Sequence, residues 1–139
     1  MSPLDLVESS DYKTSLAETP SITAPDAFPR SVVITGIAGN LGRTLAKLLH
    51  TESRIIGLDR RLFREKPKDI EHHQVDIRKK KAEDIFRRGR IDALIHMGIV
   101  HDPRVPHSEA HSFNVIGTHK ILENCVRYGV KKVVVLSNG

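Results

Sequence analysis

The sequence predicts an α/β domain built around a doubly wound parallel sheet of about five strands. Three observations predict it. Five short runs rich in apolar residues recur between residues 31 and 136, segments with helical apolar spacing separate most of them, and a glycine-rich turn follows the first run. Because parallel neighbours need right-handed crossover connections, we expect helices on both faces of the sheet.

The strands are predicted from their length and apolar content. Residues 31–35 (SVVIT) are mostly β-branched and are closed by Gly36, which is typical of a buried strand. The later strands are expected over residues 54–59, 74–77, 92–96 and 132–136. A doubly wound fold arranges such strands in the order 3-2-1-4-5, here with the sheet incomplete at its C-terminal side.

Three helices are predicted from apolar residues at helical spacing. The first covers residues 40–50, the second residues 80–88, and a long one residues 108–128, with Gly129 at its C′ position. A basic loop over residues 60–68 takes the place of a helix before the third strand. The apolar stripe expected to face the sheet from the first helix consists of Leu41, Leu45, Leu48 and Leu49.

The first 29 residues differ in composition from the rest. They are rich in Ser, Thr and Pro and carry five acids and one base, a balance of −4, whereas residues 30–139 carry +9. Prolines interrupt regular structure there. We therefore expect a flexible acidic tail over residues 1–29, with a short helix near residues 4–16 as the alternative, and one domain over residues 30–139.

The composition also bounds the function classes. No apolar run approaches the roughly 18 residues of a membrane span, residues 1–6 do not form a secretory signal, and Cys125 is alone. We expect a cytoplasmic protein without a membrane partner. The basic residues at 79–81, 87 and 88 indicate a solvated helix face, with nucleic-acid binding as the less favoured alternative, since no nucleic-acid-binding module accompanies them.

The turn after the first strand reads TGIAGNLG over residues 35–42. Gly36 would permit the sharp exit from the strand, Gly39 would let a pyrophosphate approach the backbone, and Gly42 would let the helix pack closely. The alternative is a tight turn that binds nothing. The context predicts a Rossmann-like site for phosphates at the helix N-terminus. Its candidate cofactor residues are Gly36, Ala38, Gly39, Asn40, Leu41 and Gly42.

Asp59 ends the second strand, 17 residues after Gly42. A carboxylate there can accept hydrogen bonds from both hydroxyls of an adenosine ribose and would repel a 2′-phosphate, which favours NAD over NADP. Arg60 and Arg61 follow at once, and either can neutralise such a phosphate, so NADP stays an alternative.

The sequence resembles the extended short-chain dehydrogenase/reductase family, which includes NAD-dependent sugar-nucleotide epimerases and dehydratases. The resemblance runs from about residue 30 to 137, through TGIAGNLG (35–42), GLDR (57–60), VDIR (75–78) and NVIGTHKILENCVRYGVKKVVVLS (114–137). It implies further cofactor contacts. In that family the residues that match Asp76 and Ile77 bracket the adenine ring. Those that match Met97, Gly98 and Ile99, after the fourth strand, line the cofactor, and Asn114 matches a position near it.

Two of these residues keep a structural alternative. Asp76 precedes the second helix and can cap it instead. Asn114 can make a hydrogen bond between a helix and a loop instead of contacting a cofactor.

The catalytic residues of the resembled family have no clear match. That family uses a Tyr-x-x-x-Lys pair beside a Ser or Thr. Tyr12 has no lysine four residues on, and a helix end separates Tyr128 from Lys132. Ser137 is a doubtful candidate, because the third residue of the family's serine cluster falls on Gly139. We expect no catalytic residue in this chain, which then resembles the N-terminal part of a longer enzyme.

The histidines predict no metal site. His107 and His111 are one turn apart, but a solvated helix start explains them. His96 is expected to be a packed, hydrogen-bonded histidine, and the adjacent His72 and His73 face opposite sides of an extended chain. Cys125 is expected in the core.

The sequence thus predicts the dinucleotide-binding part of an epimerase/dehydratase-like oxidoreductase, whose substrate is a nucleotide sugar or a similar secondary alcohol. The alternatives are a non-catalytic nucleotide-sensing or interaction module and a basic nucleic-acid-binding domain. Exposed sheet surfaces also predict limited stability or self-association into a homo-oligomer.

Overall fold

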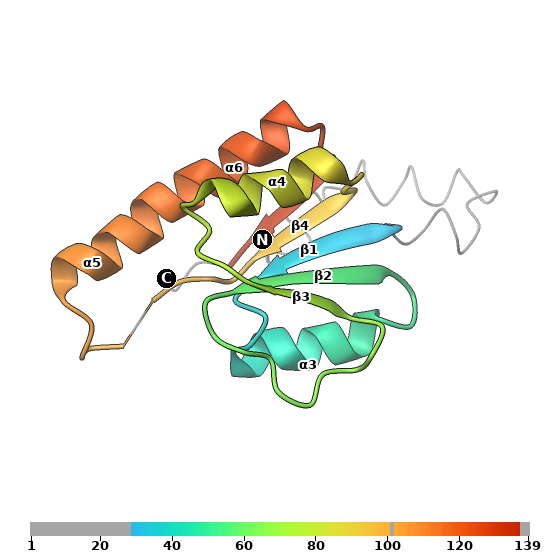
Figure 1. Ribbon diagram of the computed structural model, residues 1–139, viewed down its shortest axis with the longest axis horizontal. Helices are drawn as coiled ribbons and strands as arrows, with labels where there is room; N and C mark the ends of the chain where they lie inside the picture. Colours follow the sequence, from blue (N-terminus) through green and yellow to red (C-terminus); the bar gives the residue numbers. More distant parts are fainter. Residues whose placement is uncertain (1–28, 101, 137–139) are drawn as a thin grey trace, which may run out of the picture.

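The computed structural model describes residues 29–100 and 102–136, which form one sheet with helices on both of its faces (Figure 1). The expected tail, apart from Pro29, and Ser137 lie outside the described residues. The elements in chain order are β1 Ser31–Thr35, α3 Asn40–Leu49, β2 Arg54–Asp59, β3 Glu71–Gln74, α4 Lys80–Arg88, β4 Ala93–His96, α5 His107–His111, a π-helical segment Ser112–Ile116, α6 Gly117–Arg127 and β5 Lys132–Val135.

The five strands pair in the order β3-β2-β1-β4-β5, and every pair is parallel, which confirms the predicted order. The α3 helix lies on one face, and α4 and α6 lie on the other (Figure 1). In the central register, Thr35 lies opposite Leu58 and His96, so the carboxyl ends of three strands meet at one edge of the sheet.

Two apolar clusters fill the space on the two sides of the sheet. One contains Ile37 and Ala46 on the α3 side, and the other contains Phe86 and Cys125 on the α4 and α6 side. Burial raises the pKa of the Cys125 thiol to about 11, as expected for an inert core cysteine. The loop over residues 60–70 also covers the α3 side, because its Phe63 and Ile70 are buried there.

The predicted stripe on α3 is partly wrong. Leu41 and Leu48 are 58% and 68% exposed, whereas Gly42 and Ala46 are buried. The reason is the close approach of the helix to the turn: a Cβ on Gly42 would lie 2.3 Å from the Gly36 carbonyl oxygen. Small residues therefore make the contact, and the helix is rotated relative to its most apolar stripe.

The third strand is also displaced from its prediction. It covers Glu71–Gln74 instead of residues 74–77, and it pairs with the second half of β2. Because β3 is an edge strand, polar side chains can occupy it without being buried. The apolar Val75 and Ile77 follow the strand and enter the core on the α4 side. Other strand and helix bounds shift by at most one residue.

The predicted long helix is present, but it is not α-helical throughout. A π-helical segment, Ser112–Ile116, separates α5 from α6. The helix ends as predicted: Gly129 has a φ of 73°, and the Val130 N–H donates to the Cys125 carbonyl at 2.9 Å. This is a Schellman-type end that satisfies an otherwise unpaired carbonyl.

Replacing Gly129 by Ala is expected to lower the free energy of unfolding by about 1 kcal/mol, because an L side chain is strained at positive φ. Gly89→Ala is the control. Gly89 has a φ of −129°, and a Cβ there meets only the Ile85 carbonyl at 3.7 Å. The control should be neutral or slightly stabilising. Urea unfolding measures both variants, and equal losses would contradict this account of the helix end.

Candidate functional site

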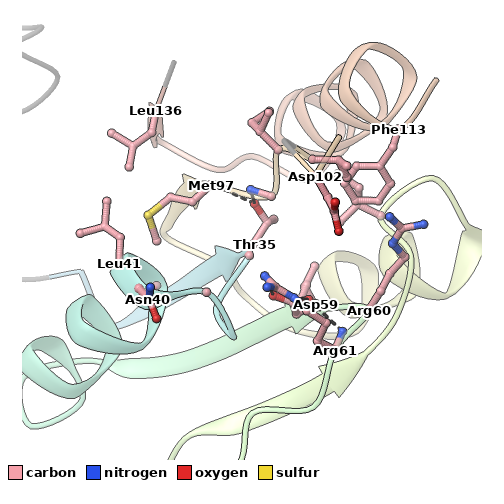
Figure 2. Close-up of a pocket in the computed structure, with 18 of the residues that line it drawn as sticks. Thr35, Asn40, Leu41, Asp59, Arg60, Arg61, Met97, Asp102, Phe113 and Leu136 are labelled. Atoms are coloured by element: carbon pink, nitrogen blue, oxygen red, sulfur yellow. Dashed lines mark hydrogen bonds and ion pairs between the residues drawn. The ribbon is translucent and has the colours of Figure 1, made fainter. Parts of the chain in front are cut away.

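A cleft of about 750 Å³ lies at the carboxyl ends of the strands (Figure 2), where the connections that follow β1 and β4 lead to opposite faces of the sheet. Most of the predicted cofactor residues line it. These are Gly36, Gly39, Asn40, Leu41, Gly42, Asp59, Arg60, Arg61, Ile77, Met97, Gly98 and Ile99. Its lining also includes residues that the sequence analysis missed: Thr35, Leu58, Val75, Val100, Asp102, Val105, Phe113 and Leu136.

The three glycines of the turn differ in what a side chain would meet at each position. Gly36 has a φ of 73°, and a Cβ on it would lie 2.6 Å from the Met97 carbonyl oxygen. Gly42 is required by the close helix contact. A Cβ on Gly39, in contrast, would meet no atom closer than 3.4 Å. The packing of the protein does not require glycine at 39, whereas a ligand that approaches the turn would.

The N-terminus of α3 faces this space. Gly39 is its N-cap residue, no side chain caps the helix, and the first turn contains no acidic residue. The first N–H groups of a helix have no partner within it, and together with the helix dipole they favour an anion. The turn therefore suits a diphosphate group.

Asp59 connects the end of β2 to the glycine turn. Its carboxylate accepts from the Ala38 N–H at 2.9 Å and from the Arg61 N–H at 2.8 Å. It also accepts from Arg61 Nε and Nη2, both at 3.1 Å. Ala38 does not line the cleft, and its backbone serves this contact.

Arg60 takes a different direction from Arg61 (Figure 2). Its guanidinium lies 4.2 Å from the centre of the Phe113 ring, and its Nη1 lies 3.6 Å from Glu109. Such a contact between a cation and a ring is attractive. Arg78, on the same ring at 5.4 Å, also bonds to Glu109. The two arginines therefore have partners on the wall opposite the glycine turn.

A buried hydrogen-bond chain joins β1, β4 and α6 beneath the cleft. Thr35 Oγ1 accepts from the N–H groups of Met97 and Gly98 at 2.9 and 3.0 Å, so its hydroxyl proton is left for His96 Nδ1 at 2.6 Å. His96 Nε2 therefore carries the ring proton and donates to Thr118 Oγ1 at 2.8 Å. Burial lowers the pKa of His96 to about 4. The histidine is packed and hydrogen-bonded, as predicted, and it helps to hold the loop that lines the cleft.

Comparison with known proteins identifies the family. Residues 32–138 match the model of the NAD dependent epimerase/dehydratase family. The chain belongs to this family. A dTDP-D-glucose 4,6-dehydratase from Dictyostelium discoideum is 29% identical over 128 residues, which are 81% of this chain and 30% of that protein.

Solved structures of the epimerase/dehydratase fold agree. The epimerase Mth375 from Methanothermobacter thermautotrophicus is 25% identical, with a TM-score of 0.73, over 84% of this chain and 37% of that one. A short-chain dehydrogenase/reductase superfamily protein from Agrobacterium tumefaciens with bound NAD is 24% identical, with a TM-score of 0.69, over 79% of this chain and 33% of that one. This family member thus spans about a third of the length of these relatives.

Two residues that the family resemblance pointed to do not line the cleft. Asn114 Oδ1 accepts from the Val100 N–H at 2.7 Å, and its Nδ2 donates to the Val100 carbonyl at 3.1 Å, which is the helix–loop contact weighed as the alternative. Because Asn114 lies in the π-helical segment, local widening of the helix sets its position. A cofactor contact of Asn114 stays a prediction.

Asp76 pairs with Arg78 instead of capping α4, whose N-cap is Lys79. Burial acts to raise the pKa of Asp76, but the hydrogen bonds from Arg78 outweigh it and hold that pKa below its usual value. Its contact with adenine stays a prediction.

The remaining histidines do not assemble a metal site in the described part of the chain, where no group of three or more His, Cys, Asp or Glu side chains converges. The rings of His107 and His111 stack at 6.4 Å on the short α5. His72 and His73 have different partners, the Arg61 carbonyl and Glu71. None of the helices in residues 29–100 and 102–136 is long and apolar enough to cross a membrane.

The buried His96 predicts a loss of stability in acid. Its pKa is about 6.5 in the unfolded chain and about 4 in the folded one, so between these values the unfolded state binds more protons. The free energy of unfolding should therefore fall by roughly 2 kcal/mol from pH 6.5 to pH 5. Urea titrations at several pH values measure this.

The variants His96→Asn and His72→Asn show which histidine causes the pH dependence of the free energy of unfolding. Burial lowers the pKa of His72 as well, so it contributes with the same sign. Carboxylates such as Asp76, whose pKa is lowered, lose their contribution only as the pH falls below about 5, at the lower limit of this window. If His96→Asn keeps the full dependence between pH 6.5 and 5, the buried neutral histidine is not its source.

Proposed function

We propose that this chain binds a nicotinamide dinucleotide and forms the cofactor-binding part of an epimerase/dehydratase-like oxidoreductase. The observation that carries this proposal is Gly39, a glycine that the protein's own packing does not require, at a helix N-terminus that faces a cleft. The Agrobacterium relative with bound NAD supports it.

The residues that line the cleft suit each part of such a cofactor in turn. The free N–H groups at the start of α3 would hold the diphosphate. Asp59 and Arg61 lie where the adenosine ribose is expected, and Val75 and Ile77 offer apolar surface for the adenine. Met97 and Gly98 line the cleft beside Thr35. When bound, the nicotinamide accepts or donates a hydride.

We propose that proton transfer is the task of residues outside the described part. Such chemistry needs a group that gains or loses a proton near neutral pH. The cleft lining in residues 29–100 and 102–136 contains no Tyr, Lys, His or Cys. His96 lies below the cleft, and both of its ring nitrogens are engaged.

The relatives support a proposal for the substrate class. The Dictyostelium relative is named for dTDP-D-glucose, a nucleotide sugar, and the family comprises epimerases and dehydratases. We therefore propose a nucleotide sugar or a similar secondary alcohol as the substrate of the whole enzyme.

Replacing Gly39 by Val tests the cofactor site. A valine side chain would occupy the space in front of the helix N-terminus, so the affinity for NAD and for NADP should fall by at least about tenfold. The N-cap backbone at Gly39 is extended, with a φ of −76°, and accepts any residue. Isothermal titration calorimetry on the purified chain measures the affinities, and circular dichroism checks the fold.

The matched control is Gly89→Val, which adds the same side chain at the end of α4, where a Cβ meets only one atom at 3.7 Å. Its affinities should equal those of the wild type. If a folded wild-type chain binds neither dinucleotide at millimolar concentration, the proposed function is wrong.

A further inference from the structure

A basic surface lies at the edge of the sheet where the strands begin, opposite the edge that holds the cleft. The α4 and α6 helices both end at this edge and lead into β4 and β5 (Figure 1). Exposed cations follow the helix ends and continue to the start of β1. This surface, named the basic edge, consists of Arg30, Arg87, Arg88, Arg90, Lys131 and Lys132.

Backbone hydrogen bonds bring these cations together, although they are far apart in the sequence. The Asp92 N–H donates to the Ser31 carbonyl at 2.9 Å. The N–H groups of Lys131 and Lys132 both donate to the Asp92 carbonyl at 3.3 Å. The segments that begin β1, β4 and β5 are therefore side by side at the basic edge.

The acid between these segments does not balance their charge. The Asp92 carboxylate accepts from the Ser31 N–H at 3.0 Å and lies 3.4 Å from Arg90, whose side chain is 80% exposed. Among residues 29–100 and 102–136, neither Lys131 nor Lys132 has an ion-pair partner. The basic edge therefore presents an excess of positive charge that attracts an acidic partner.

The segment 1–28 carries the opposite charge and joins the sheet at this edge. It contains five acids and one base. It leads into Pro29, whose carbonyl accepts from Ser53 Oγ at 2.5 Å, beside the start of β1. On the β2 and β3 side of β1, Arg54 already pairs with Glu71 at 2.8 Å. The unbalanced cations thus lie on the β4 and β5 side.

The acid nearest to the sheet in sequence is within reach of these cations. β5 is two strands from β1, which is about 10 Å at the usual strand spacing. Three residues lead from Asp26 to Pro29, and an extended chain covers roughly 10 Å in that length. Single exposed ion pairs stabilise little, but acids attached to the same chain are present at a high effective concentration.

We propose that the acidic segment 1–28 binds the basic edge of its own chain and covers it. The attraction is between exposed charges, so it weakens as salt is added. A surface with this charge attracts nucleic acids and other polyanions, and the bound segment keeps them away. The inference does not rest on the proposed function, because the cleft lies at the other edge of the sheet.

Paramagnetic broadening of amide NMR signals in the full chain tests the proposal. The nitroxide is attached through Ala24→Cys, since the native Cys125 is buried. The signals of residues 87–92 and 130–133 should lose most of their intensity. Those of residues 69–72 should not, although β3 is also two strands from β1. About 0.5 M NaCl should restore the signals, because it screens exposed charges.

Two triple variants of the labelled chain separate local attraction from net charge. Each replaces three exposed cations by Gln and lowers the formal net charge from +5 to +2. The first removes part of the basic edge, and the second removes cations elsewhere on the surface: Arg90→Gln, Lys131→Gln and Lys132→Gln; and Arg43→Gln, Arg64→Gln and Lys80→Gln. The broadening should disappear in the first and persist in the second. Circular dichroism checks that both fold.

Equal broadening of residues 87–92 and 69–72, or broadening of neither, overturns the proposal. So does the same response in both triple variants, or broadening that persists in high salt. A mixture of labelled chain and unlabelled isotope-enriched chain should show no broadening, and broadening there would assign the contact to a second copy instead. If the label has no effect and a single-stranded DNA oligonucleotide shifts the signals of residues 87–92 and 130–133, the basic edge serves an external polyanion and the proposal is wrong. If the first variant does not fold, the salt titration decides.

Discussion

The cleft depends on a contact between two backbones. The α3 helix approaches the turn after β1 so closely that a Cβ on Gly42 would lie 2.3 Å from the Gly36 carbonyl oxygen. This contact explains why Gly42 and Ala46 form the buried face of α3, and why Leu41 lies at the cleft instead of under the helix. It also sets the helix N-terminus beside the strand ends, where its dipole and free N–H groups act on the same space.

Polar contacts then tie the separate elements of the site together. The chain from Thr35 through His96 to Thr118 links β1, β4 and α6 in a buried environment, where a hydrogen bond is strong and an unpaired group is costly. The Ala38 N–H bonds to Asp59 and links the glycine turn to β2. Because these bonds involve groups with few alternative partners, the loop positions around the cleft are closely determined.

The charged side chains of the cleft are also held by specific partners. Arg60 and Arg61 enter from one loop but are held on opposite walls, one by an aromatic ring and an acid, the other by Asp59. With no acidic residue in the first turn of α3, the helix N-terminus at the cleft favours a negatively charged group. The contact that orders Arg61 also fills acceptor positions of the Asp59 carboxylate.

The residue order alone was sufficient to predict the fold class, the strand order, the glycine turn, Asp59 at the end of β2 and the cap at Gly129. The turn and the cap depend on local backbone preferences, whereas the fold class and strand order follow from the alternation of strands and helices and the rules for parallel crossovers. It did not predict which face of α3 packs inward, the place of β3, the π-helical segment, or the bond between Thr35 and His96, which are 61 residues apart. Nor did it predict that Arg61 occupies Asp59 while Arg60 turns to Phe113. Only the tertiary structure decided these, because packing and competition among distant groups select one partner from several that local preference allows.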